Sequence, residues 1–193
     1  MRANRLEAFS DGVIAIIITI MVLDLHVPVD WTRPEILKIV PTLLSYTLSF
    51  VIVAIYWVNH HHLIHLVQKV DALTLWANIN LLFWMSFMPW ITACLGKYHH
   101  TPAVVAIYGG VALACSAAFH LLRRSIACHH RGSERLTALH RKLAHKNYVA
   151  LLVYVAAIPL AWITIAGSLI MIALPALMYF LPDREVEQLE VQE

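Results

Sequence analysis

Two aspartates lie close together on an apolar segment near the start of the chain, residues 5–25, with the sequence RLEAFSDGVIAIIITIMVLDL. The 12 residues between Asp11 and Asp24 carry no charge. As a helix they cover about 18 Å, less than the roughly 30 Å of hydrocarbon in a bilayer. At least one carboxylate must then lie within the membrane or at its edge, where an ionised group is costly unless protein or water surrounds it. The segment is therefore expected to pack inside protein or to line an aqueous path.

Histidines are the second set of residues with possible chemistry. The chain has 12 of them, and two groups are predicted on one side of the membrane: His60, His61, His62 and His65, then His129, His130, His140 and His145. Neutral imidazoles bind iron and zinc, and membrane di-iron desaturases gather histidine boxes in this way. No HxxHH box occurs, and the HxxxxH spacing of the pair 140 and 145 does not fit the usual i, i+4 pairing. A solvated set of histidines is favoured, so no metal site and no cofactor is expected; a His-rich metalloenzyme is kept as the alternative function.

The composition is that of an integral membrane protein. The 193 residues are 60% hydrophobic and 13% charged, whereas roughly a quarter of a soluble domain is charged. A net charge of +2 without a long basic run gives no sign of a nucleic-acid partner. Cys94, Cys115 and Cys128 show no CxxC spacing, so neither a disulfide nor a thiolate metal site is expected. The sequence also lacks a nucleophile elbow, a phosphate loop and paired catalytic carboxylates, and we expect no enzyme activity.

Uncharged runs predict an all-α fold with six transmembrane helices, because one span needs about 20 mostly apolar residues. After residues 5–25, one run extends from Ile39 through Trp57 into a histidine cluster, and the next two are 72–96 and 101–122. The last run, 147–182, is long enough for two spans, with Pro159, Gly167 and Pro175 as candidate breaks. Pro41 is expected near the start of the second helix, where its missing N–H costs little.

The distribution of Lys and Arg predicts the orientation, because these residues accumulate in cytoplasmic loops. With the N-terminus inside, eleven of them fall on the inner side and three, Arg33, Lys38 and Lys97, on the outer side. This distribution favours both termini in the cytoplasm and a basic, His-rich inner loop over 123–146. We therefore expect one six-helix transmembrane unit over 1–182, followed by an acidic cytoplasmic tail over 183–193.

Helical periodicity divides the first helix into two faces. One face carries an apolar stripe of Phe9, Ile16, Ile20 and Leu23. At 100° per residue, Asp11 points roughly 150° away from the centre of this stripe. Periodicity alone leaves two interpretations of the stripe open, ordinary helix packing or the wall of an aqueous path. Thr19 and Asp24 flank it on opposite sides.

The two aspartates are expected to have different roles. Asp11 faces neighbouring helices and is interpreted as a hydrogen-bonding clamp. Its candidate partners, near the end of the second helix and on the third, are Trp57, Asn59, His60, His61, Asn78 and Asn80. Asp24 either attracts cations at the outer mouth of a path or pairs with another helix.

The segment Arg5-x-x-x-Phe9-Ser10-Asp11 resembles the RxxxFSD signature of the transmembrane protein 175 family, the potassium channels of endosomes and lysosomes and their prokaryotic relatives. The resemblance implies a passive, potassium-preferring cation channel in the plasma membrane of a prokaryote. Four copies would assemble in the lipid bilayer with the first helix of each lining the pore. Potassium would be the permeant ion, and other monovalent cations would pass more weakly.

The resemblance also implies roles for individual residues. The hydrophobic constriction falls on Ile16, with Ile20 and Leu23 further outward and Thr19 as a nearby polar layer. Arg5, Phe9, Ser10 and Asp11 tie the first helix to its neighbours, and the partners that this sequence offers are Trp57, His60, His61 and Asn78. No TVGYG filter occurs, so selectivity must come from a narrow passage lined by side chains. A scaffold protein without transport is a third possibility.

Overall fold

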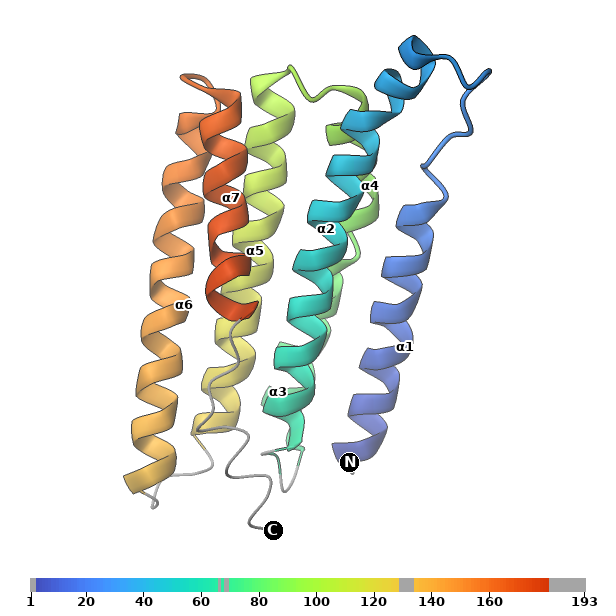
Figure 1. The fold of residues 1–193 in the computed structure, drawn as a ribbon. Helices are drawn as coiled ribbons and strands as arrows, with labels where there is room; N and C mark the ends of the chain where they lie inside the picture. The colour runs from blue at the N-terminus through green and yellow to red at the C-terminus, as the bar shows by residue number, and fades with distance from the viewer. Residues whose placement is uncertain (1–2, 66, 68–69, 129–133, 181–193) are drawn as a thin grey trace.

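The computed structural model describes residues 3–65, 67, 70–128 and 134–180. Within these residues the chain is all-α and antiparallel from one pass to the next (Figure 1). The helices are α1 (Ala3–Val22), α2 (Arg33–His65), α3 (Ala72–Met85), α4 (Met88–Lys97), α5 (Pro102–Ala127), α6 (Glu134–Leu160) and α7 (Ile165–Phe180). Because α3 and α4 continue one another, these helices make six passes, which confirms the expected number. The predicted tail over 183–193 lies outside the described residues, and its character stays a prediction.

The connections from α1 to α2, from α4 to α5 and from α6 to α7 lie at one end of the bundle (Figure 1). At the other end α1 begins and α2 ends, and α7 runs back toward it. Three helical stretches of the described chain are long and apolar enough to cross a membrane: Arg33–His65, Ala72–Lys97 and Pro102–Ala127. The arrangement agrees with a multi-pass protein, and which end faces the cytoplasm stays a prediction.

The third pass differs from the single helix expected over 72–96. It is divided at Ser86 and Phe87, and Pro89 lies in the first turn of α4. Proline has no backbone N–H, so Pro89 cannot donate to the carbonyl of Met85 and the α-helical ladder is interrupted there. The N–H of Ser86 caps the end of α3 by donating to carbonyls of the preceding turn.

The second helix begins earlier than the expected run from Ile39, and the placement of Pro41 near its start is wrong. Pro41 lies inside α2, which begins at Arg33 and has 33 residues. The start is set by a local turn in which the backbone N–H of Thr32 donates to Asp30 over 2.9 Å. The hydroxyl of Thr32 also donates to this carboxylate, and the two bonds lower the pKa of Asp30. A helix of this length extends about 50 Å, beyond the hydrocarbon core of a bilayer.

The fifth pass also begins earlier than the sequence predicts. The expected inner loop over 123–146 is largely helical, because α5 extends to Ala127 and α6 begins at Glu134. His129 and His130 lie outside the described residues, as does the side chain of His140. Of the three candidate breaks, Pro159 is followed by the end of α6 at Leu160, whereas Gly167 and Pro175 lie within α7.

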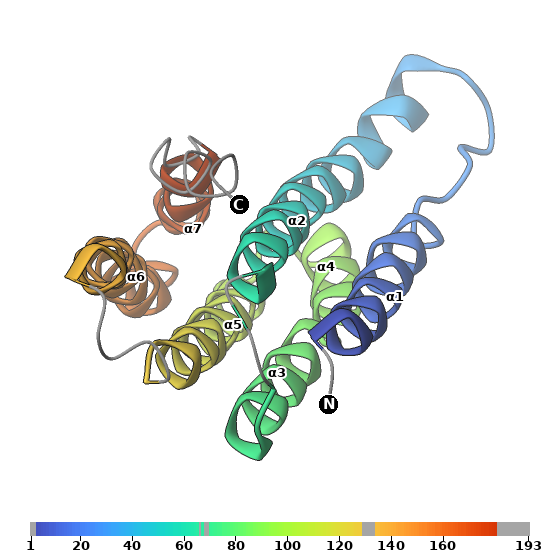
Figure 2. The same ribbon diagram turned by 90° about the horizontal axis from the view of Figure 1, so that it is seen from below.

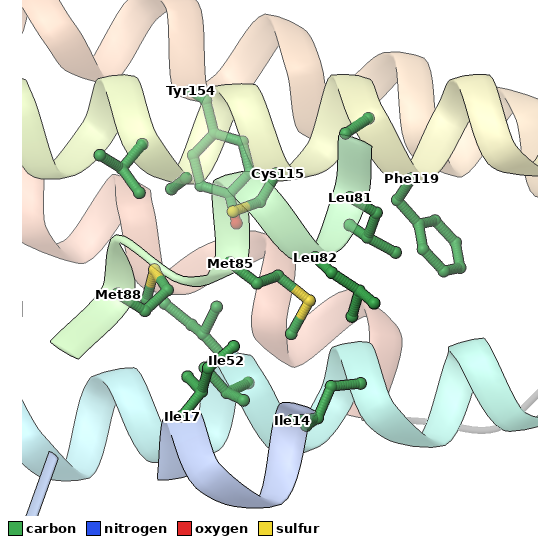
Figure 3. Close-up of a cluster of buried hydrophobic side chains, with 14 of the residues drawn as sticks. Ile14, Ile17, Ile52, Leu81, Leu82, Met85, Met88, Cys115, Phe119 and Tyr154 are labelled. Carbon is green, nitrogen blue, oxygen red and sulfur yellow. The ribbon is translucent and has the colours of Figure 1, made fainter. Parts of the chain in front are cut away.

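Helix α1 lies at one edge of the bundle and packs against α2, α3 and α4 (Figure 2). Its buried side chains Ile14 and Ile17 meet Ile52 of α2 and a cluster around Met85 and Met88 (Figure 3). These contacts place one face of α1 against the bundle and leave the other face outward.

Candidate functional site

Helix α1 has one buried face and one uncovered face. Its buried residues are Leu6, Ser10, Ile14, Ile17 and Met21. The predicted apolar stripe lies on the other face, where Phe9 is 57% exposed, Ile16 57%, Ile20 46% and Leu23 78%. Leu23 follows the last residue of α1 by one position. No described helix of the same chain covers the stripe, so this surface is available to lipid, to water or to another copy.

Thr19 and Asp24, the two residues predicted beside the stripe, lie toward its C-terminal end. The Thr19 hydroxyl is exposed and donates to the backbone carbonyls of Ala15 and Ile16, each over 3.0 Å. Asp24 lies in the turn that follows α1, and its backbone carbonyl accepts a 2.7 Å hydrogen bond from the His26 ring. The Asp24 carboxylate forms no hydrogen bond or ion pair with another residue that the structure describes.

Asp11 meets one of its predicted partners on α2. The indole N–H of Trp57 donates to the Asp11 carboxylate over 2.9 Å. The Trp57 ring is also stacked on His61, with ring centroids 6.4 Å apart. The hydrogen bond therefore orients the Trp57 side chain, near the end of α2, toward α1.

A fully buried hydrogen-bond chain joins α1, α2 and α3. The Asn78 amide donates to the Ser10 hydroxyl over 2.9 Å, and its oxygen accepts a 2.7 Å bond from His60 Nε2. Ser10 donates in turn to the carbonyl of Leu6 over 2.9 Å. His60 Nδ1 is buried without a hydrogen-bond partner among the described residues. Buried polar groups are costly unless they are paired, so these hydrogen bonds specify how the three helices fit together.

Glu7 is a residue that our sequence analysis missed. Its carboxylate lies 2.8 Å from His61 Nδ1 and 3.5 Å from His65 Nε2. Two local signals could have identified this contact. Glu7 precedes Asp11 by four residues and so shares its helix face, and the two histidines have the i, i+4 spacing that places both on one face of α2.

The structure brings together six of the eight residues predicted to form the network: Ser10, Asp11, Trp57, His60, His61 and Asn78. Arg5 and Phe9 are separate from them. Both side chains are exposed, and Arg5 forms no hydrogen bond or ion pair with another described residue. Within one chain they therefore do not tie α1 to its neighbours, because they lie on its uncovered side. Asn59, another candidate partner of Asp11, donates instead to the carbonyl of Ile55.

Comparison with known proteins identifies the family. The family described as endosomal/lysosomal potassium channel TMEM175 matches residues 5–89, which include both the Arg5-to-Asp11 motif and Asn78. A potassium channel of Chryseobacterium sp. strain P1-3 is 41% identical over 97% of this chain and 97% of its own length. The chain belongs to the TMEM175 family. The resemblance carried by the RxxxFSD motif is thus confirmed.

Further relatives in the TMEM175 family are also potassium channels, and one of them has a similar solved fold. A potassium channel of Chamaesiphon minutus is 38% identical over 64% of this chain and 66% of its own. The crystal structure of a lysosomal potassium-selective channel TMEM175 homolog from Chamaesiphon minutus has a TM-score of 0.82 and 27% identity, covering 95% of this chain and 97% of that one. These relatives are ion channels and not enzymes, so the expectation of no enzyme activity is supported and the histidine-based enzyme has no counterpart among them.

Proposed function

We propose that this chain is a passive, potassium-preferring cation channel in which four copies place α1 around a central pore. The observation that carries the proposal is the uncovered apolar stripe on α1, which lies opposite the buried polar contacts that hold the helix in the bundle. The family relationship supports the proposal, since the bacterial relatives named above are potassium channels. The proposed location is the plasma membrane of a prokaryote, with both termini in the cytoplasm.

The stripe suits a hydrophobic constriction. Around a fourfold axis, Ile16, Ile20 and Leu23 would form successive apolar rings, with Ile16 and Ile20 about 6 Å apart along the helix. Such rings restrict a hydrated ion and can close a pore by dewetting. We assign the narrowest ring to Ile16, the position at which the family resemblance implies the constriction.

Polar groups beside the rings would help a cation to enter. The Thr19 hydroxyl gives its proton to backbone carbonyls, so its oxygen retains a lone pair that can face an ion. We place Asp24 at the outer mouth, where four carboxylates would raise the local cation concentration. The absence of a partner for its carboxylate among the described residues favours this role over pairing with another helix.

The experiment that tests the channel is ion flux through purified protein in liposomes, with reversal potentials measured for potassium and sodium. We expect potassium flux and a modest preference for potassium. Ile16→Asn should lower that preference by hydrating the constriction and admitting sodium. Ile107→Asn, at an exposed position of α5 away from the stripe, is the matched control and should retain the wild-type preference.

Two results would count against the proposal. Well-folded protein that carries no flux would overturn the channel itself. If Ile16→Asn and Ile107→Asn both keep the wild-type reversal potentials, Ile16 does not form the constriction.

A further inference from the structure

Helix α1 begins and α2 ends at the same end of the bundle (Figure 1). Three potential metal ligands from these two helices converge there. They are the carboxylate of Glu7 and the imidazoles of His61 and His65, and one ligand atom from each lies within 4.8 Å of the others. Glu7 Oε1 is 2.8 Å from His61 Nδ1 and 3.5 Å from His65 Nε2. The two imidazole rings are themselves in contact, with centroids 4.4 Å apart.

This ligand set has a chemical preference. Two imidazole nitrogens and one carboxylate oxygen suit zinc and similar first-row divalent ions, whereas magnesium and calcium prefer sites made of oxygen alone. With bonds of about 2.0–2.1 Å, tetrahedral zinc holds its ligand atoms about 3.3 Å apart. The Glu7–His65 pair is already near that separation, and the Glu7–His61 pair would open by about half an ångström.

The site is accessible and partly organised in advance. The side chains of His61 and His65 are 43% and 51% exposed, so an ion can reach them from water. Both project from one face of α2, and stacking on Trp57 restrains the His61 ring. Three protein ligands leave a fourth position for water, as in zinc sites that remain open.

We propose that Glu7, His61 and His65 form a binding site for a zinc-class divalent metal ion that links α1 to α2. For His61 to bind through Nδ1, the proton that it shares with Glu7 moves to Nε2, and the metal replaces the Glu7–His61 hydrogen bond. This site revises the expectation that the chain has no metal ligands. Its consequence for transport rests on the proposed function: a bound ion fixes α1 against α2, opposes displacement of the pore helix and lowers potassium flux.

Binding is tested first by calorimetric titration of ZnCl2 into the full chain purified without a histidine tag, since a tag would bind the same ions. We expect saturable binding of one ion per chain and none for MgCl2. Glu7→Gln, which keeps a hydrogen-bonding group beside His61, and His65→Ala, at an exposed side chain, should each weaken affinity at least about tenfold, because each removes one of three ligands.

The control removes other imidazoles. His99 and His100 lie in the connection between α4 and α5, at the opposite end of the bundle. The double variant His99→Ala/His100→Ala should bind zinc as the wild type does. Wild-type titration curves for both Glu7→Gln and His65→Ala, or loss of binding only in the control, would overturn the site.

A flux assay separates this inference from the channel proposal. Zinc should reduce potassium flux into liposomes for the wild type and for His99→Ala/His100→Ala, but not for His65→Ala. Zinc binding at the three residues with unchanged potassium flux would refute the regulatory consequence. Zinc binding by folded protein that carries no flux at all would instead overturn the proposed function and leave the metal site standing.

Discussion

At the scale of residues, the side-chain amide of Asn78 links α1 to α2 and α3. Asn78 satisfies Ser10 with its NH2 group and His60 with its oxygen, and all three side chains are fully buried. Leaving one of these groups unpaired costs about 1–3 kcal/mol, more than most single apolar contacts. Asp11 lies nearer the surface, where its bond with Trp57 adds to this anchor.

Asp11→Ala should lower the free energy of unfolding by about 1–2 kcal/mol, because it removes the acceptor of the Trp57 indole bond. Asp11→Asn keeps an acceptor oxygen and should cost less than Asp11→Ala. Denaturant unfolding of each purified variant measures the difference.

Ion selectivity tests whether Asp11 acts on the permeating ion. As a positioning residue that faces away from the stripe, it should leave the potassium-to-sodium ratio unchanged in Asp11→Asn. An altered ratio in intact oligomers would mean that its charge acts on the permeating ion, contrary to its assignment as a clamp.

At the scale of elements, α4 approaches α2 closely at Gly96. A Cβ atom added to Gly96 would lie 3.0 Å from the Cα atom of Thr42 and 3.2 Å from its side-chain atoms. Thr42 follows Pro41, so the segment of α2 that contains the proline is also the one that α4 approaches. A glycine is favoured at this crossing, because an added Cβ would press on backbone, which moves aside less easily than a flexible side chain.

Gly96→Ala should destabilise the fold by about 1–3 kcal/mol through overpacking between α2 and α4. Gly110→Ala in α5 is the matched control, because an added Cβ there would meet nothing within 4 Å. The control should be neutral or stabilising by up to about 1 kcal/mol, since alanine favours a helix. Thermal unfolding of both variants in the same detergent compares them, and an equal loss of stability would exclude the close approach as the cause.

At the scale of the whole molecule, the single chain leaves one face of α1 uncovered. This helix lies at the edge of the bundle with its apolar stripe uncovered (Figure 2). The proposed tetramer turns this stripe inward and accounts for the exposed Phe9 and Arg5, which would then lie near neighbouring copies instead of helices of their own chain.

Disulfide cross-linking tests the proposed assembly. In a Cys128→Ser background, which removes the exposed native thiol, Ile20→Cys should form disulfide-linked dimers on oxidation, because copies of α1 meet around the pore. Ile170→Cys, at an exposed position of α7, should not. Native mass spectrometry should give four chains per particle; a monomer, or equal cross-linking at the two positions, would contradict the assembly.

Much of the architecture could be predicted from the sequence because it depends on local properties. The lengths of the apolar runs were enough to predict six passes, and the 100° periodicity was enough to predict that Asp11 lies away from the stripe. Boundaries were less predictable. The apolar run that begins at Ile39 gives no sign that the turn at Asp30 and Thr32 starts α2 already at Arg33. The expected single third helix overlooked the effect of Pro89.

The sequence by itself determined the all-α class, the number of passes, the family motif and the face of α1 on which Ile16 lies. Only the tertiary structure decided that Trp57 meets Asp11, that Asn78 joins Ser10 to His60, and that Glu7 lies beside two histidines. The physical reason is that apolar length and helical periodicity are properties of one segment, whereas contacts between helices depend on their relative rotation and height, which are set by packing of the whole core.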